Sequence, residues 1–197
     1  MAEAKRRFAL LVEGSQDAIH PNLRGALLSI AIQHGGEVEF NHVIELYRKS
    51  PLQEQKVSAL SALCGVHQPE LISRVLEFAF TDEVRPQDAP YVFSNLSANI
   101  KARQIVWTFF QEKWKLIHEK FSGGSFLLGR IASSVCGCHT TDEMAAKVEA
   151  FIASLPKADI SSIDKEILQS VEKVRANAKW VKTEAEHTAK WLKDEGY

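Results

Sequence analysis

The stretch WTFFQEKWKLIHEKF, residues 107–121, decides the fold class. Its large apolar residues stand at positions i, i+3, i+7, i+10 and i+14, which are Trp107, Phe110, Trp114, Ile117 and Phe121. This spacing places them on one face of an α-helix, where burial against neighbouring elements is the main source of stability. The pattern predicts a helix packed into an apolar core, and it favours a packing role for the two tryptophans over an exposed aromatic platform.

Similar helical stripes recur on both sides of this stretch. They comprise Phe40, Val43, Ile44 and Tyr47; Leu71, Ile72, Val75, Leu76 and Ala79; Met144, Val148, Phe151, Ile152 and Leu155; and Ile160, Ile163, Ile167, Val171, Val174, Ala178 and Val181. The only strand-like alternation, residues 37–40, is too short to compete with these stripes. The chain is therefore expected to be all-α.

Short breaks separate the stripes. Gly35 can end one helix, Pro51 breaks the next, and Pro69 begins another. Thr140, with Glu143 three residues later, is a capping-box signal for a further helix start. We expect about ten helices joined by short turns. Antiparallel helix pairs of this kind form either a closed bundle or a stacked solenoid, and periodicity alone does not choose between them.

Composition excludes several classes of function. The formal net charge of −1 argues against a surface for nucleic acid or anionic membrane, because phosphate binding needs clustered Lys and Arg. No apolar run reaches the roughly 18 residues that span a bilayer, and no secretory signal pattern is visible. The three cysteines are no disulfide framework and fit a reducing compartment. The sequence therefore predicts a cytoplasmic protein.

Chemical motifs are incomplete. His118 and Glu119 begin an H-E-x-x-H zinc motif, but Ser122 stands where the second histidine belongs. Cys136, Cys138 and His139 fall short of the usual four zinc ligands, and a structural role or a reactive thiol is the alternative. Residues 122–125 resemble an anion-binding loop but lack its Lys-Ser/Thr ending. We therefore expect no catalytic residue, no metal ligand and no cofactor in this chain.

One ordered series of residues carries a family resemblance. It comprises Val84-Arg85-Pro86-Gln87-Asp88, Arg103, Trp107-x-Phe109, Trp114, Phe121-x-Gly123-Gly124, Thr141, Glu149-x-Phe151, Gln169, Glu172-x-Val174-x-x-Asn177-x-x-Trp180 and Trp191-Leu192. In order and spacing the series resembles the C-terminal domain of the gluzincin aminopeptidases, over about residues 21 to 193. It is most similar to the puromycin-sensitive aminopeptidases and the fungal alanine/arginine aminopeptidases. Lys113 and Ile152 depart from the family pattern.

The resemblance implies a fold and a role. The fold is a HEAT/armadillo-like solenoid of antiparallel helix pairs, with residues 1–197 as a single helical-repeat domain, the later part of a larger C-terminal domain. In this family the domain forms a bowl that caps the catalytic domain and limits which peptides reach the zinc site. The zinc motif H-E-x-x-H and the G-x-M-E-N segment belong to an upstream domain of the same polypeptide, and neither occurs here. The chain alone is therefore expected to be inactive.

Three residues are candidates for peptide contact. Arg24 and Arg85 could attract a substrate carboxylate, and Gln87 is the weaker candidate. The alternative for each is a structural role, since Arg85 precedes Asp88 where a helix begins. The alternative function for the whole chain is a stand-alone helical-repeat module that binds a partner protein. In isolation, we expect self-association through the segment before about Asn22, because a terminal repeat without its neighbour exposes apolar surface.

Overall fold

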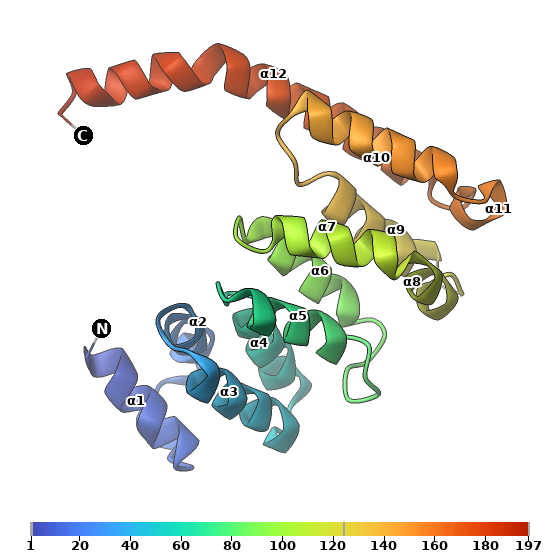
Figure 1. Ribbon diagram of the computed structural model, residues 1–197. Coiled ribbons are helices and arrows are strands. Elements are labelled where there is room, and N and C mark those ends of the chain that lie inside the picture. The colour runs from blue at the N-terminus through green and yellow to red at the C-terminus, as the bar shows by residue number, and fades with distance from the viewer. Residues whose placement is uncertain (1, 124, 197) are drawn as a thin grey trace. The chain divides into compact units, whose positions relative to one another are not determined.

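The computed structural model describes residues 2–123 and 125–196, and these residues form an all-α fold with no strand among them (Figure 1). The twelve α-helices are α1 Ala2–Val12, α2 Arg24–His34, α3 Glu37–Lys49, α4 Gln53–Leu63, α5 Pro69–Phe78, α6 Ala89–Ala98, α7 Arg103–Glu112, α8 Trp114–Phe121, α9 Ser125–Cys136, α10 Asp142–Ser154, α11 Lys157–Ile160 and α12 Asp164–Asp194. Two 3-10 turns, Gln16–Ala18 and Pro21–Leu23, join α1 to α2. The predicted all-α class is confirmed, and the strand-like residues 37–40 begin α3 instead.

The expected count of about ten helices is too low, because the 107–121 stripe is divided and α11 forms a separate short turn. The stripe breaks at Lys113, whose φ of −105° and ψ of 15° leave the helical region. Hydrogen bonds from Lys113 N to Phe109 O and from Ile117 N to Lys113 O, both 2.9 Å, continue across the break. The large apolar side chains therefore keep their spacing across Lys113, although α7 and α8 are separate helices.

Several helix boundaries follow the local breakers. Pro69 occupies the first turn of α5, and α3 ends at Lys49 before Ser50 and Pro51. At α10, however, the capping residue is Thr141, whose side-chain oxygen accepts a hydrogen bond from Met144 N at 3.2 Å. The prediction of Thr140 as the cap was wrong by one residue, because either neighbouring hydroxyl could fill the role.

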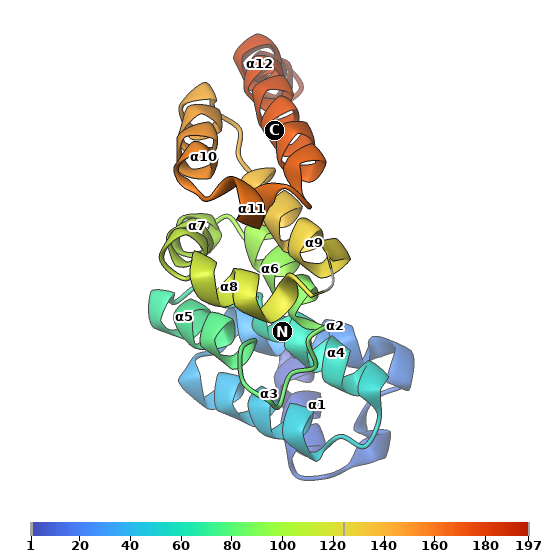
Figure 2. The same cartoon turned by 90° about the vertical axis from the view of Figure 1, so that its right-hand side faces the viewer.

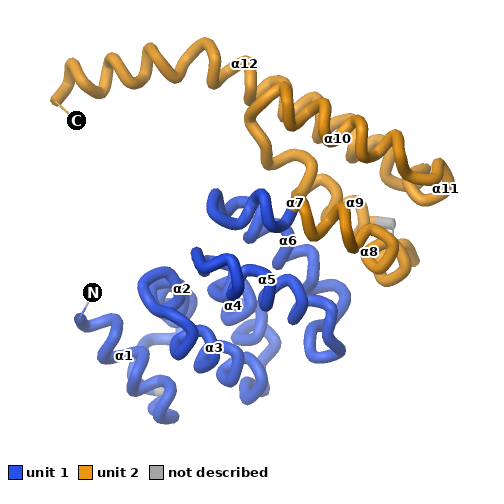
Figure 3. The backbone as a smooth tube through the Cα atoms, viewed as in Figure 1, with its two compact units in different colours: residues 1–106 blue, residues 107–197 orange. Residues whose placement is uncertain are grey.

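The chain divides into two compact units, residues 1–106 and residues 107–197 (Figure 3). In the first unit, α4 is central, since it packs against α2, α3 and α6. Its residues Ala59, Leu60, Ala62 and Leu63 are buried. At Gly25 in α2, an added Cβ would lie 2.9 Å from Ser58 Oγ in α4, so α2 and α4 approach one another closely.

In the second unit, α9 and α10 both pack along α12 (Figures 1 and 2). An aromatic cluster lies in its core. The Phe151 ring is 5.6 Å from the Trp107 ring, 5.9 Å from the Phe110 ring and 6.3 Å from the Trp114 ring, between centroids. Trp107 and Trp114 are buried, which confirms their predicted role in packing.

The helices of the described ranges lack the features of membrane-spanning helices. None of them, over residues 2–123 and 125–196, has both the length and the apolar character needed to cross a membrane. Even α12, which has 31 residues, is too polar, because charged residues recur along it.

Candidate functional site

Arg85 is anchored on a buried carboxylate. Its Nε donates a hydrogen bond to Asp88 Oδ2 at 2.9 Å, and its Nη2 donates to Asp88 Oδ1 at 3.2 Å. Asp88 also accepts from Gln53 Nε2 of α4 at 2.8 Å. The Asp88 side chain is 4% exposed, whereas that of Arg85 is 47% exposed. The bidentate pair raises the Arg85 pKa and fixes the direction of the guanidinium, while part of it stays accessible to solvent.

A second carboxylate and a tyrosine hydroxyl lie near this anchor. The Tyr47 hydroxyl donates to the Glu83 carbonyl oxygen at 2.8 Å. Burial raises the Tyr47 pKa, and the nearby Asp88 and Glu83 carboxylates raise it further. Glu83 is paired with Arg48 across 2.7 Å, and this hydrogen-bonded pair lowers the Glu83 pKa. In the connection that carries Arg85, the carboxylate of Glu83 is therefore paired with Arg48, and the carboxylate of Asp88 is paired with Arg85 itself.

Arg24 lines a separate groove of about 350 Å³ in the first unit. The groove is lined by Leu11, Arg24, Leu28, Leu46, Lys49, Ser50, Pro51, Gln55 and Ala59. Arg24 begins α2 and is half-buried, and Lys49 is exposed at the end of α3. Ser50 Oγ donates to Gln55 Oε1 at 2.8 Å, which orients the amide at the rim. A groove with two cationic side chains on apolar walls suits a carboxylate attached to an apolar group.

The three predicted contact residues do not share one pocket. Arg85 and Gln87 belong to the connection between α5 and α6, where Gln87 is exposed, and neither lines the Arg24 groove. Both regions border the first turns of α4, because Gln55 lines the groove and Gln53 binds Asp88. The sequence did not reveal the contributions of Gln53, Gln55 and Lys49, which depend on contacts between distant segments.

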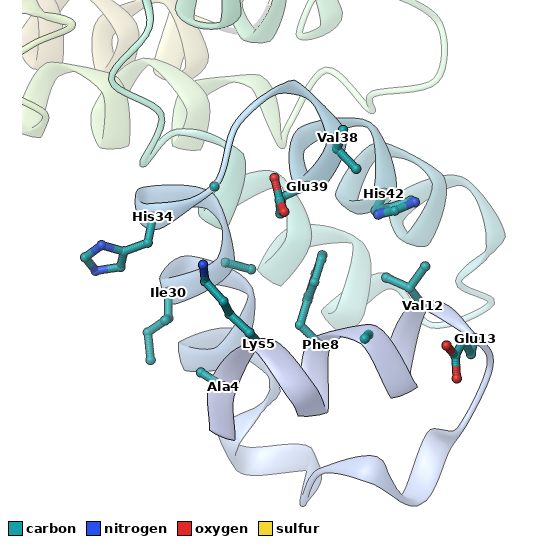
Figure 4. Close-up of a pocket in the computed structure, with 13 residues that line it drawn as sticks. Ala4, Lys5, Phe8, Val12, Glu13, Ile30, His34, Val38, Glu39 and His42 are labelled. Carbon is teal, nitrogen blue, oxygen red and sulfur yellow. The ribbon is translucent and has the colours of Figure 1, made fainter. Parts of the chain in front are cut away.

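A second hollow, of about 290 Å³, lies between α1, α2 and α3 (Figure 4). Phe8 and Val12 of α1, together with Ile30 of α2 and Val38 of α3, provide apolar walls. Glu39 is polar but engaged, since its Oε2 accepts from Gly36 N at 2.8 Å, which lowers the Glu39 pKa. The amphipathic pattern of residues 2–12 was the available sequence signal for this hollow, and it was missed.

The cysteine and histidine residues occupy packed positions in the described structure. Cys136 is buried at the end of α9, and burial raises its pKa to about 12. Cys138 is half-buried, with its Sγ 3.8 Å from His139 Nε2, and His139 packs edge-on against Trp107. Within residues 2–123 and 125–196, no three His, Cys, Asp or Glu side chains converge as metal ligands would. The proposed 122–125 loop includes Gly124, which lies outside the described residues.

Comparison with known proteins adds the decisive observation. The model of the ERAP1-like C-terminal domain family matches residues 1–176. The chain belongs to this family. The resemblance to the C-terminal domain of aminopeptidases, stated from the motif series, is therefore confirmed.

Curated relatives of this ERAP1-like C-terminal domain include longer proteins named as aminopeptidases. Aminopeptidase 2 of Candida albicans is 29% identical over 198 residues, covering 100% of the chain and 21% of the relative. Aminopeptidase M1 of Arabidopsis thaliana is 32% identical over 187 residues, covering 93% of the chain and 21% of the relative. Aminopeptidase N of Canis lupus familiaris is 30% identical over 177 residues, covering 89% of the chain and 18% of the relative. The chain thus spans about one fifth of the length of these relatives.

All three candidate contact residues lie within the family match, and so do the two hollows. The match ends at residue 176, inside α12, whereas the similarity to Aminopeptidase 2 extends over the whole chain. The part of α12 after residue 176 therefore lies beyond the match to the ERAP1-like C-terminal domain family, but it is still included in the similarity to Aminopeptidase 2.

Proposed function

We propose that this chain is the non-catalytic C-terminal part of a zinc aminopeptidase, which removes N-terminal residues from peptides. In this role it caps the catalytic domain and shapes the cavity through which peptides enter. One observation carries the proposal: the chain matches a C-terminal domain family and accounts for about one fifth of three aminopeptidases.

The catalytic chemistry belongs, in this proposal, to the upstream catalytic domain of the same polypeptide. Peptide hydrolysis requires polarisation of the carbonyl group, activation of water and a general base, which zinc and a carboxylate supply together. Residues 1–197 act as one helical-repeat domain of stacked helix pairs and contribute no metal ligand. The cytoplasm is the proposed location, since the odd number of thiols suits a reducing compartment.

Arg85 and Arg24 are the proposed contacts for the carboxylate of a peptide substrate. Arg85 suits this task because Asp88 holds its guanidinium while 47% of the side chain stays exposed. Arg24 suits it because its groove also contains Lys49 and the oriented amide of Gln55. Gln87 is a weaker contact that offers its amide from the exposed side of the same connection as Arg85.

The experiment replaces the C-terminal fifth of Aminopeptidase 2 with this chain and measures kcat and KM for peptides of increasing length and for aminoacyl-arylamides. Arg24→Gln and Gln87→Ala should raise KM for long peptides several-fold and leave arylamide kinetics unchanged. Equal effects on both substrates would indicate a folding role. If kcat and KM of the fused enzyme do not differ between long and short substrates, the gating proposal is wrong. A stand-alone interaction module then becomes the better explanation.

The isolated chain provides a second check. It should not hydrolyse aminoacyl-arylamides in the presence of added zinc, and chelator-sensitive turnover would contradict the proposal. It should also self-associate through the segment before Asn22, because α1 of that segment borders a hollow at which Val38 of α3 is 64% exposed and Ile30 of α2 is 36% exposed. Light scattering at increasing concentration tests this expectation, and a strictly monomeric chain would contradict it.

A further inference from the structure

The apolar stripe of α12 continues far beyond the part of the helix that is buried. Ile167, Val171, Val174 and Ala178 alternate at spacings of four and three residues, and each is at most 6% exposed. The same spacing then continues to Val181, Ala185, Thr188 and Leu192. Since α9 and α10 pack along α12, the first half of the stripe is an interface, and the second half prolongs that interface without interruption.

The second half of α12 exposes large apolar side chains. Trp180 is 61% exposed and Trp191 is 54% exposed, while Val181 and Leu192 are both 39% exposed. With 3.6 residues per turn, Val181 and Leu192 continue the line of the buried stripe, and the two tryptophans lie next to each other about 100° round the helix, at the edge of this surface. We call this surface, made of Trp180, Val181, Ala185, Thr188, Trp191 and Leu192, the α12 stripe. Figure 1 shows this end of α12 extending past α10.

The second half of α12 has little tertiary packing to support it. Residues 179–194 continue the helix beyond its buried positions at 167–178, and most helical stability in proteins comes from packing of an apolar face. Its residues keep an amphipathic pattern, with Lys179, Lys182, Glu186 and Lys190 opposite the stripe. One charged residue departs from it, because Glu184, four residues after Trp180 and seven before Trp191, lies on the tryptophan side. The pattern is that of a docking surface, since large exposed apolar side chains gathered on one face mark interaction sites.

The charges decide against a membrane or nucleic-acid partner. Residues 179–195 carry the basic residues Lys179, Lys182, Lys190 and Lys193 and the acidic residues Glu184, Glu186, Asp194 and Glu195. Helices that bind anionic membranes have a polar face rich in Lys and Arg, and nucleic-acid surfaces need an excess of positive charge. A balanced segment has neither property, so the partner is an apolar protein surface.

The size of the α12 stripe decides against a second copy of the chain. A symmetric pair would contribute six residues from each copy, whereas stable interfaces use about 20 to 30 residues on each side. A partner in the same polypeptide does not need that area, because covalent linkage supplies an effective concentration on the order of mM. The relatives provide such a partner, since about four fifths of their length lies outside the region that this chain matches.

We infer that the α12 stripe docks into an apolar groove in the upstream part of the aminopeptidase polypeptide and thereby holds the capping domain in place. Trp180 and Trp191 are the anchors, because indole rings combine a large apolar surface with one N–H donor that suits the rim of an interface. The inference rests on the proposed function, and it adds the surface by which the cap is attached.

Hydrogen–deuterium exchange tests the docking directly. Amides of residues 179–194 should exchange rapidly in the isolated chain and at least tenfold more slowly when the chain replaces the C-terminal fifth of Aminopeptidase 2. The double variant Trp180→Ser/Trp191→Ser should abolish this protection. Leu168→Ser is the matched control, because Leu168 is 61% exposed on the opposite face of α12 and its loss should leave the protection unchanged. Circular dichroism of each isolated variant verifies that it folds.

Three outcomes would overturn the inference: equal exchange of 179–194 in the isolated and the fused chain, protection that survives loss of both tryptophans, or protection that appears in the isolated chain as its concentration rises. The last would identify a second copy as the partner. Failure of the proposed function has a different signature, because gating is read from KM against peptide length. If α12 is protected in the fused chain but substrate selectivity is unchanged, the docking inference holds and the gating proposal is wrong.

Discussion

Gln53 of α4 and Arg85 of the connection between α5 and α6 donate hydrogen bonds to the same carboxylate oxygen, Oδ2 of Asp88. Asp88 thereby joins the first turn of α4 to the start of α6, and it does so while almost entirely buried. The arrangement explains how a charged residue is accommodated inside the first unit, since buried charges are stable only when paired and hydrogen-bonded.

Replacing Asp88 by Ala should therefore destabilise the first unit. The change leaves the Gln53 amide and the inner face of Arg85 without their acceptor, at a cost of about 1 to 3 kcal/mol. Urea denaturation followed by circular dichroism measures the loss. Asp82→Ala is the control, because Asp82 is exposed in the same connection. Equal stabilities of the two variants would show that the Asp88 hydrogen bonds are energetically neutral.

Gly35 and Gly36 should respond differently to alanine. A Cβ on Gly35 would lie 2.4 Å from the Ala31 carbonyl oxygen and 2.7 Å from the Glu39 side chain, whereas a Cβ on Gly36 would meet nothing within 4 Å. Gly35→Ala should cost about 1 to 3 kcal/mol from overpacking, with Gly36→Ala nearly neutral. The two thermal midpoints provide the measurement. A Gly36 variant as unstable as the Gly35 variant would contradict the steric explanation.

The pH dependence of stability should contain a contribution from Glu39. Hydrogen bonding to the Gly36 N–H lowers the Glu39 pKa from its ordinary value of 4.5 in the folded chain. The charged form therefore stabilises the fold above pH 4.5, and this stabilisation is lost as the pH falls through the lowered folded-state pKa. The stability difference between wild type and Glu39→Gln should shrink on acidification, while exposed Glu77→Gln should follow wild type. A difference that is constant with pH would exclude this mechanism.

The aromatic cluster should dominate the stability of the second unit. Phe110 is fully buried and contacts the rings of Trp107, Trp114 and Phe151. Phe110→Ala should cost about 3 to 5 kcal/mol through lost burial and an unfilled cavity. Chemical denaturation provides the measurement, and Phe126→Ala is the control because Phe126 is 70% exposed. Similar losses in both variants would show that burial of the ring is not the source of the effect.

The three thiols should differ in reactivity. Burial raises the pKa of both Cys64 and Cys136, whereas Cys138 is half-buried. A disulfide reagent at about pH 8 should therefore modify Cys138 alone in the native chain and all three thiols in denaturant, since the thiolate is the reactive form. Mass spectrometry of digested protein identifies the modified residue. Rapid native labelling of Cys136 would mean that the end of α9 opens readily.

Much of the fold could be predicted because helical periodicity reports burial directly. The stripes at Phe40–Tyr47 and at Ile167–Ala178 are buried, and Pro51 and Pro69 mark helix boundaries. The errors were local. Thr141 rather than its neighbour caps α10, and α7 and α8 separate at Lys113, where no proline or glycine signals a break. Periodicity describes which face is buried but says little about a single non-helical residue.

The surroundings of the candidate site could be predicted less well. The pairing of Arg85 with Asp88 is local, at three residues of separation, and the sequence offered it as the structural alternative. The contribution of Gln53 could not be anticipated, because it comes from 35 residues away and depends on how α4 meets the connection. The hollows beside Arg24 and beside α1 depend in the same way on the packing of several helices.

The distribution of tryptophan has a spectroscopic consequence. Trp107, Trp114, Trp180 and Trp191 are the four tryptophans of the chain, and all belong to the second unit. Indole emission therefore reports the unfolding of residues 107–197 alone, whereas far-ultraviolet circular dichroism records the helices of both units. Superimposable melting curves from the two signals would mean a single cooperative transition, and displaced curves would resolve two folding units without any added label.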